Sequence, residues 1–204
     1  MNTEKVLSTS AVILICGFDF CAIAGDTRLT MYDRGMQSIK SNKFHKVFKL
    51  NNNILYGVTG YFDEEDGIGP FVGEYITDKN YYIENAVVEV QKFRKRCSKL
   101  PAQTFLLAGK GRPGNFAAAV LPFKQGEREC QPDLDVPGNG QCWLRFSVPS
   151  MSEQAAEQII QHKIENTMPF TSLDVLTSHM KNAVKEISKV DKTVNSNIDI
   201  FTII

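Results

Sequence analysis

Two short runs of apolar residues near the start of the chain predict a pair of buried strands. Residues 11–16 (AVILIC) and 20–24 (FCAIA) are apolar throughout, and the turn-forming residues 17–19 separate them. Two such runs around a tight turn predict a hairpin that is buried on both faces. Residues 46–50 and 54–58, with three asparagines between them, predict a second hairpin.

From residue 83 the apolar residues recur at a helical spacing. This stripe consists of Ile83, Ala86, Val87, Val90, Phe93 and Cys97. It predicts an amphipathic helix. The opposite face carries a basic strip formed by Lys92, Arg94, Lys95, Arg96 and Lys99. We interpret this strip as a solvated helix face.

The second half of the chain predicts strands, then helices, then a last strand. Three further strands are predicted at residues 104–108, 116–121 and 142–146, and the long polar connection 124–141 predicts a protruding surface loop. One helix is expected to open at Ser150–Glu153, which has the spacing of a capping box, and another near Thr171. The chain is expected to end in a strand, Ile198–Ile204. This order predicts an α+β fold, with sheets packed on each other and helices outside.

Composition narrows the class of protein. The chain has 204 residues, 43% of them hydrophobic, and 23 basic residues balance 23 acidic ones. This length predicts a single domain over residues 1–204. Zero net charge argues against a nucleic-acid groove or a polybasic membrane anchor. From the first residues we expect no secretory signal, and no apolar run approaches the ~20 residues of a membrane span. Five cysteines without a C-x-x-C motif fit reduced core thiols in an intracellular protein.

Metal and cofactor motifs are weak in this sequence. None of the three histidines pairs with a cysteine or a second histidine at ligand spacing. The segment Gly109–Gly114 resembles a phosphate loop, but Asn115 and Phe116 follow it where Lys and Ser or Thr are required. It lies between two predicted strands, so we interpret it as a hairpin turn. We therefore expect no cofactor and no metal.

The first 60 residues carry a more specific pattern. It consists of Ala24-Gly25-Asp26-Thr27-Arg28, then Ser38-Ile39 and Ser41, then Lys46-Val47-Phe48, then Gly57-Val58-Thr59-Gly60. The pattern resembles beta-type subunits of the proteasome core particle, which belong to the N-terminal-nucleophile (Ntn) hydrolase superfamily and the peptidase T1 family. The non-catalytic sixth beta type is the most similar, and the third type is the alternative. The resemblance implies a four-layer αββα sandwich.

Ntn chemistry requires that the nucleophile be the first residue of the mature chain. Its free α-amine then acts as the general base, with a pKa of ~7.7–8.0. By the resemblance, the nucleophile position falls on Ser10, and Thr9 stands where active members have the glycine needed for self-cleavage. Asp26 matches the supporting aspartate. Lys46 matches the lysine, with Lys43 as a weaker candidate.

The later part of the family site is also altered. Asp191 matches the late aspartate, but the serine that should follow it falls on Val194, with Ser196 slightly out of register. Ser150-Met151-Ser152 stands where active members have Gly-Ser-Gly. We therefore expect Ser10, Asp26, Lys46 and Asp191 to be degenerate remnants of a catalytic site, and Asp26 with Arg28 or Lys46 to be a buried charge pair.

The resemblance implies a structural function without catalysis. The chain would keep residues 1–9 as a short unprocessed extension and occupy a place in the beta ring of the 20S proteasome, in the cytoplasm and nucleus. Its partners would be the other beta-type and alpha-type subunits of a stacked four-ring particle that degrades ubiquitin-marked proteins, with no nucleic acid and no membrane. One alternative is an active Ntn hydrolase that uses Ser10 after removal of residues 1–9. Another is a free-standing scaffold with the same fold.

Overall fold

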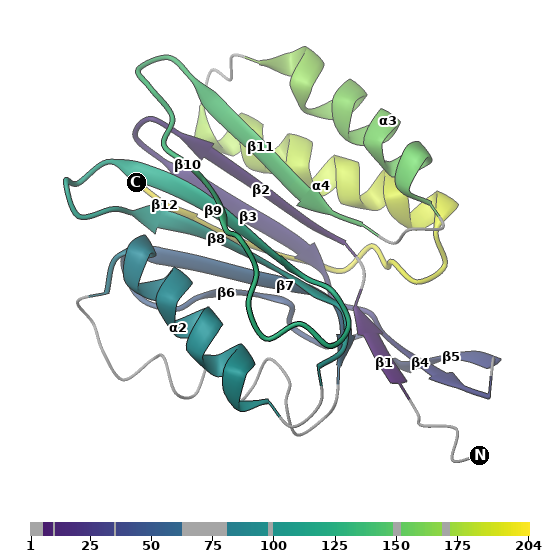
Figure 1. Cartoon of the computed structure of the whole chain (residues 1–204). Helices are drawn as coiled ribbons and strands as arrows, with labels where there is room; N and C mark the ends of the chain where they lie inside the picture. The colour runs from purple at the N-terminus through teal and green to yellow at the C-terminus, as the bar shows by residue number, and fades with distance from the viewer. Residues whose placement is uncertain are drawn as a thin grey trace.

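A computed structural model describes residues 6–9, 11–34, 36–62, 81–97, 100–148, 152–168 and 172–204. Within these residues the chain forms three α-helices, a short 3₁₀ helix and two antiparallel sheets. Figure 1 shows the two sheets stacked on each other, with helices covering the outer side of each sheet. The predicted α+β class is confirmed.

The larger sheet has eight strands and holds both the start of the chain and its middle. Its order is β10-β9-β8-β7-β1-β4-β5, and β6 pairs separately with β7. The strands are β1 (Val6–Thr9), β4 (Leu29–Asp33), β5 (Met36–Ser41), β6 (Val47–Lys49), β7 (Ile54–Phe62), β8 (Gln103–Lys110), β9 (Phe116–Phe123) and β10 (Asp133–Asp135).

The smaller sheet has four strands in the order β11-β2-β3-β12. These strands are β2 (Val12–Gly17), β3 (Cys21–Asp26), β11 (Cys142–Ser147) and β12 (Ile198–Ile203). Every residue of the central strands β2 and β3 is buried, as their continuous apolar runs predicted.

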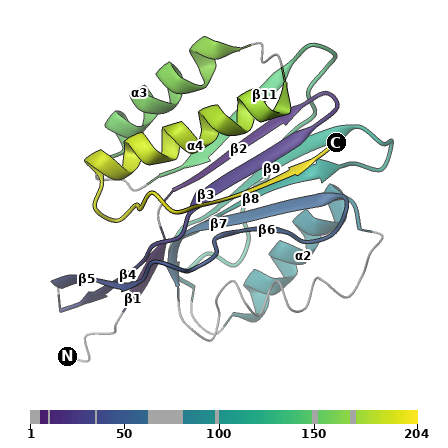
Figure 2. The same cartoon turned by 180° about the vertical axis from the view of Figure 1, so that it is seen from behind.

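Three apolar clusters show how the elements stack. The helix α2 (Ile83–Arg96) packs on the eight-stranded sheet through Ile83, Ala86, Val90 and Phe93. The helices α3 (Glu153–Lys163) and α4 (Leu173–Val190), joined through the 3₁₀ helix η1 (Glu165–Thr167), pack on the outer face of β2 and β3. A third cluster lies between the sheets. Figure 2 shows α3 and α4 from behind, over the four-stranded sheet.

Most of the predicted elements are confirmed, and the strands that the pattern missed are the exposed or short ones. Both hairpins, the three helices, the strands of the middle region and the last strand are present, and Gly109–Gly114 lies at the turn between β8 and β9. The sequence analysis did not predict β1, β4, β5 or β10. In β5 the residues alternate little in polarity because five of its six side chains are exposed.

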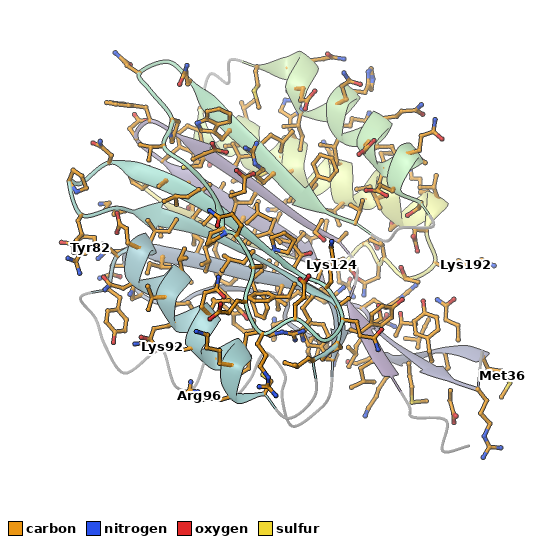
Figure 3. All side chains as sticks on the ribbon, in the orientation of Figure 1. Met36, Tyr82, Lys92, Arg96, Lys124 and Lys192 are labelled. Atoms are coloured by element: carbon orange, nitrogen blue, oxygen red, sulfur yellow. The ribbon has the colours of Figure 1, made fainter. Side chains whose placement is uncertain are left out.

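Arg94 corrects two expectations. Arg94 belongs to the basic strip that was predicted to be solvated, but its side chain is fully buried. Lys92 and Arg96 of the same strip do point outward from α2 (Figure 3). The guanidinium of Arg94 donates to the carbonyls of Pro101 (2.6 Å) and Glu127 (2.9 Å) and to Gln103 Oε1 (2.9 Å). The connection 124–141 is therefore held against the body rather than protruding, and its residues 133–135 pair with β9.

The start of α3 also differs from expectation. The N-cap residue is Ser152, and its hydroxyl does not cap the helix but donates to Asp191 Oδ2. Ser150 and Met151, which belonged to the predicted capping box, lie outside the described residues. The serine that could have capped α3 is thus used in a contact between distant parts of the chain.

The chain passes between the two sheets at two places that lie side by side. It leaves the eight-stranded sheet at Thr9 and enters the four-stranded sheet at Val12, and it returns between Asp26 and Leu29. Ala11 and Asp26 face each other across these crossings, because the amide of Asp26 donates to the Ala11 carbonyl (3.2 Å). Asp26, one of the residues predicted for the family site, lies at this point.

Candidate functional site

Asp26 is the centre of the candidate site, at the end of β3. Its Oδ1 accepts hydrogen bonds from the amide of Ala11 (3.1 Å) and from Lys46 Nζ (2.5 Å). Its Oδ2 accepts from the amides of Arg28 (2.9 Å) and Asn195 (3.2 Å). The carboxylate therefore joins both sheet crossings to the segment that precedes β12.

Lys46 reaches Asp26 from the start of the second hairpin. The carbonyl of Lys46 accepts the amide of Val58 (3.1 Å), which fixes its backbone against β7. The side chains of Lys46 and Asp26 are both 0% exposed. Burial lowers the pKa of Lys46 because it penalises the ammonium, and the contact with Asp26 opposes that shift. The structure thus brings two of the predicted site residues into a buried ion pair.

Asp191 ends α4 and organises the loop that leads to β12. Its Oδ2 accepts from Ser152 Oγ (2.5 Å), and its Oδ1 accepts from the amide (2.7 Å) and hydroxyl (2.6 Å) of Thr193. This loop contacts Asp26 through Asn195. Its backbone also accepts the guanidinium of Arg28, at the carbonyl of Lys192 (2.6 Å). Asp191 therefore belongs to the same hydrogen-bonded region as Asp26, through the chain between residues 191 and 195.

The remaining predicted positions divide into three groups. Ser10 lies outside the described residues, as do Ser150 and Met151. Lys43 and Ser196 are exposed, so neither replaces the buried residues at the centre. Val194, which stands at the position predicted for the missing serine, is a buried apolar residue packed with α4 and α3.

Three residues of the site were not predicted as partners of the carboxylates. Asn195 supplies a backbone amide to Asp26, and its side-chain oxygen accepts the amide of Thr27 (3.1 Å). Ser152 and Thr193 supply the hydroxyls that Asp191 accepts. Ser152 lies in the segment that the resemblance matched to the Gly-Ser-Gly of active members, and an aspartate two residues before Thr193 is typical of an Asx turn.

The arrangement explains what these residues can do chemically. An Ntn site needs a free α-amine beside the lysine and the aspartate, because only that amine can act as the base. Here the amide of the next residue, Ala11, is fixed on Asp26 Oδ1. A buried pair of this kind contributes little net stability, whereas removal of one partner leaves an uncompensated buried charge.

The described part of the chain contains little that indicates another kind of site. No cluster of three or more His, Cys, Asp or Glu side chains there could hold a metal ion. None of the described helices combines the length and apolarity needed to cross a bilayer. No protein-family model matches the chain, and no curated protein matches it in sequence.

Proposed function

We propose that this chain is a non-catalytic structural beta-type subunit of the 20S proteasome core particle, most like the sixth beta type. The stacking of α2, the eight-stranded sheet, the four-stranded sheet and the pair α3 and α4 supports the four-layer αββα sandwich of Ntn hydrolases. The buried pair Asp26–Lys46, at two positions of the family motif, supports the same assignment.

The observation that carries the non-catalytic part of the proposal is the strand β1. Residues 6–9 pair with β4 on one side and β7 on the other, so β4 and β5 join the eight-stranded sheet through β1. Leu7 is buried in the cluster under α2. Cleavage between Thr9 and Ser10 would turn this internal strand into a detached peptide. Retention of residues 1–9 keeps the nitrogen of Ser10 in an amide, which cannot act as a base.

An exposed hairpin supports a role in assembly. The strands β4 and β5 project from the body, with Met36 at the far end (Figure 3). Met36 is 69% exposed and Ile39 is 53% exposed. β5 is the edge strand of the eight-stranded sheet and its side chains are mostly exposed, so contact with a neighbouring ring subunit would cover this edge. In this proposal the partners are other beta-type and alpha-type subunits, and the protein is located in the cytoplasm and nucleus.

The experiment that tests the proposal is intact mass and N-terminal sequencing of the chain, purified in its native complex. We expect a particle much larger than the chain and a mass that retains residues 1–9, apart from the initiator Met and an acetyl group. A chain that begins at Ser10 and is trapped by a peptide epoxide or boronate would establish the enzyme alternative. Elution as a small oligomer, with no heavier particle containing the chain, would favour a free-standing scaffold.

A further inference from the structure

Cys16 and Cys21 form a pair of thiols at the closed end of the first hairpin. They are register partners on β2 and β3, and their sulfur atoms are 3.2 Å apart. Both residues are fully buried, in the cluster between the two sheets. The structure contains no disulfide among its described cysteines.

The backbone geometry at this pair favours a cross-link. The amide of Gly17 donates to the carbonyl of Phe20 (2.8 Å), and the amide of Asp26 donates to that of Ala11 (3.2 Å). Hydrogen-bonded and non-hydrogen-bonded pairs alternate along an antiparallel ladder, so the pair of Cys16 and Cys21 is a non-hydrogen-bonded one. The Cα atoms of such pairs are about 4.5 Å apart, within the range that disulfides span.

Only a small movement separates the two thiols from a bond. A disulfide requires the sulfurs to approach by about 1.2 Å, from 3.2 Å to the bond length of about 2.05 Å. The turn that closes the pair is at the surface, where Phe18 is 48% exposed. Because both thiols are fully buried between the sheets, a small reagent reaches them only when this end of the hairpin opens.

We propose that Cys16 and Cys21 are a dithiol modification site, which a low-molecular-weight disulfide such as oxidised glutathione converts to a cross-strand disulfide. One thiolate attacks oxidised glutathione, forms a mixed disulfide and releases one glutathione thiolate. The second thiolate attacks the protein sulfur of that mixed disulfide and releases the other glutathione. Two protein thiols are oxidised, one glutathione disulfide is reduced to two thiols, and the two protons pass to glutathione.

The environment of the pair makes the reaction slow at neutral pH. Burial, and then the hydrogen bond with Cys16, raise the pKa of Cys21 well above its ordinary value. Because the thiolate is the nucleophile, the rate rises with pH. The product ties β2 to β3 at the centre of the four-stranded sheet and prevents the end of the hairpin from opening. The inference does not depend on the proposed function.

The test uses the full-length folded chain in glutathione redox buffers at pH 8 and 9. Samples are quenched with acid, denatured and alkylated with N-ethylmaleimide before intact mass is measured. We expect three N-ethylmaleimide labels instead of the five of the reduced chain, so the alkylated chain is lighter by about 252 Da, which is two labels of about 125 Da and two hydrogens, and it carries no glutathione adduct at the end point. A protease that cleaves the peptide bond before Asp19 places Cys16 and Cys21 in separate peptides. These two peptides stay joined only if a disulfide links them.

Two variants control for the other cysteines. Cys142→Ser removes the thiol of β11 and is expected to keep the cross-link, whereas Cys16→Ala is expected to abolish it. The proposal is overturned if all five thiols remain alkylatable in the folded chain. It is equally overturned if oxidation gives only glutathione adducts, links Cys142 instead, or occurs only after the chain is unfolded in urea.

Discussion

The buried pair Asp26–Lys46 gives the sharpest prediction, because its two members differ in what they leave behind when removed. At an effective dielectric constant near 20, unit charges 2.5 Å apart attract by about 7 kcal/mol. Desolvation costs several kcal/mol for each ion, so the net contribution of the intact pair is small. Removal of one partner, however, leaves an uncompensated charge in the core.

Lys46→Met removes the ammonium but keeps the amide donors of Ala11, Arg28 and Asn195 on the remaining carboxylate. We expect it to lower the free energy of unfolding by about 3 kcal/mol, the lower end for a broken buried pair. Asp26→Ala removes the carboxylate from Lys46 and also removes the acceptor of those three amides. We expect a loss of about 5 kcal/mol or more.

The assay is urea denaturation of the isolated chain, followed by circular dichroism and tryptophan fluorescence and analysed by linear extrapolation. Lys95→Met is the matched control, because Lys95 pairs with Glu129 at the surface and both side chains are more than half exposed. It is expected to leave the midpoint unchanged. Losses below about 1 kcal/mol for both core variants, or a larger loss for Lys46→Met than for Asp26→Ala, would refute the reasoning.

Three further predictions test other parts of the structure. Leu7→Ala should lower the free energy of unfolding by about 2–5 kcal/mol and make the chain between β4 and β5 more sensitive to protease. An unchanged digestion pattern would contradict the role of β1 in attaching β4 and β5 to the sheet. Arg94→Ala should release the connection 124–141, seen as faster hydrogen exchange there, whereas Arg96→Ala on the exposed side of α2 should not. Burial, and then the charge of Cys16, raise the pKa of Cys142 to about 11. Because the thiolate is the reactive form, iodoacetamide should alkylate Cys142 about 100-fold more slowly at pH 8 in the folded chain than in the unfolded chain. The thiol of Cys142 ionises at a lower pH in the unfolded chain than in the folded chain. The free energy of unfolding should therefore fall between pH 9 and 11, and a rise over that range would contradict the raised pKa of Cys142.

The pattern of apolar and polar residues was sufficient to predict a strand or helix wherever each of its faces has one kind of environment along its whole length. The runs that form β2 and β3 are apolar throughout because both of their faces are covered, and the stripe of α2 follows the side that packs on the sheet. The sequence motif also indicated Asp26 and Lys46, and the structure brings them together. These features depend on residue types at short and regular spacing, which the sequence displays directly.

The tertiary structure decided the features that depend on distant partners. The strand β1 has no strong apolar pattern, and it forms because β4 and β7 pair with it from either side. Arg94 lies within a basic strip, and its burial depends on carbonyls of the connection 124–141, some 30 residues further along the chain. Asn195 meets Asp26 across 169 residues. Hydrogen bonds of this kind join groups far apart in the sequence, so the periodicity of a single segment carries no signal for them.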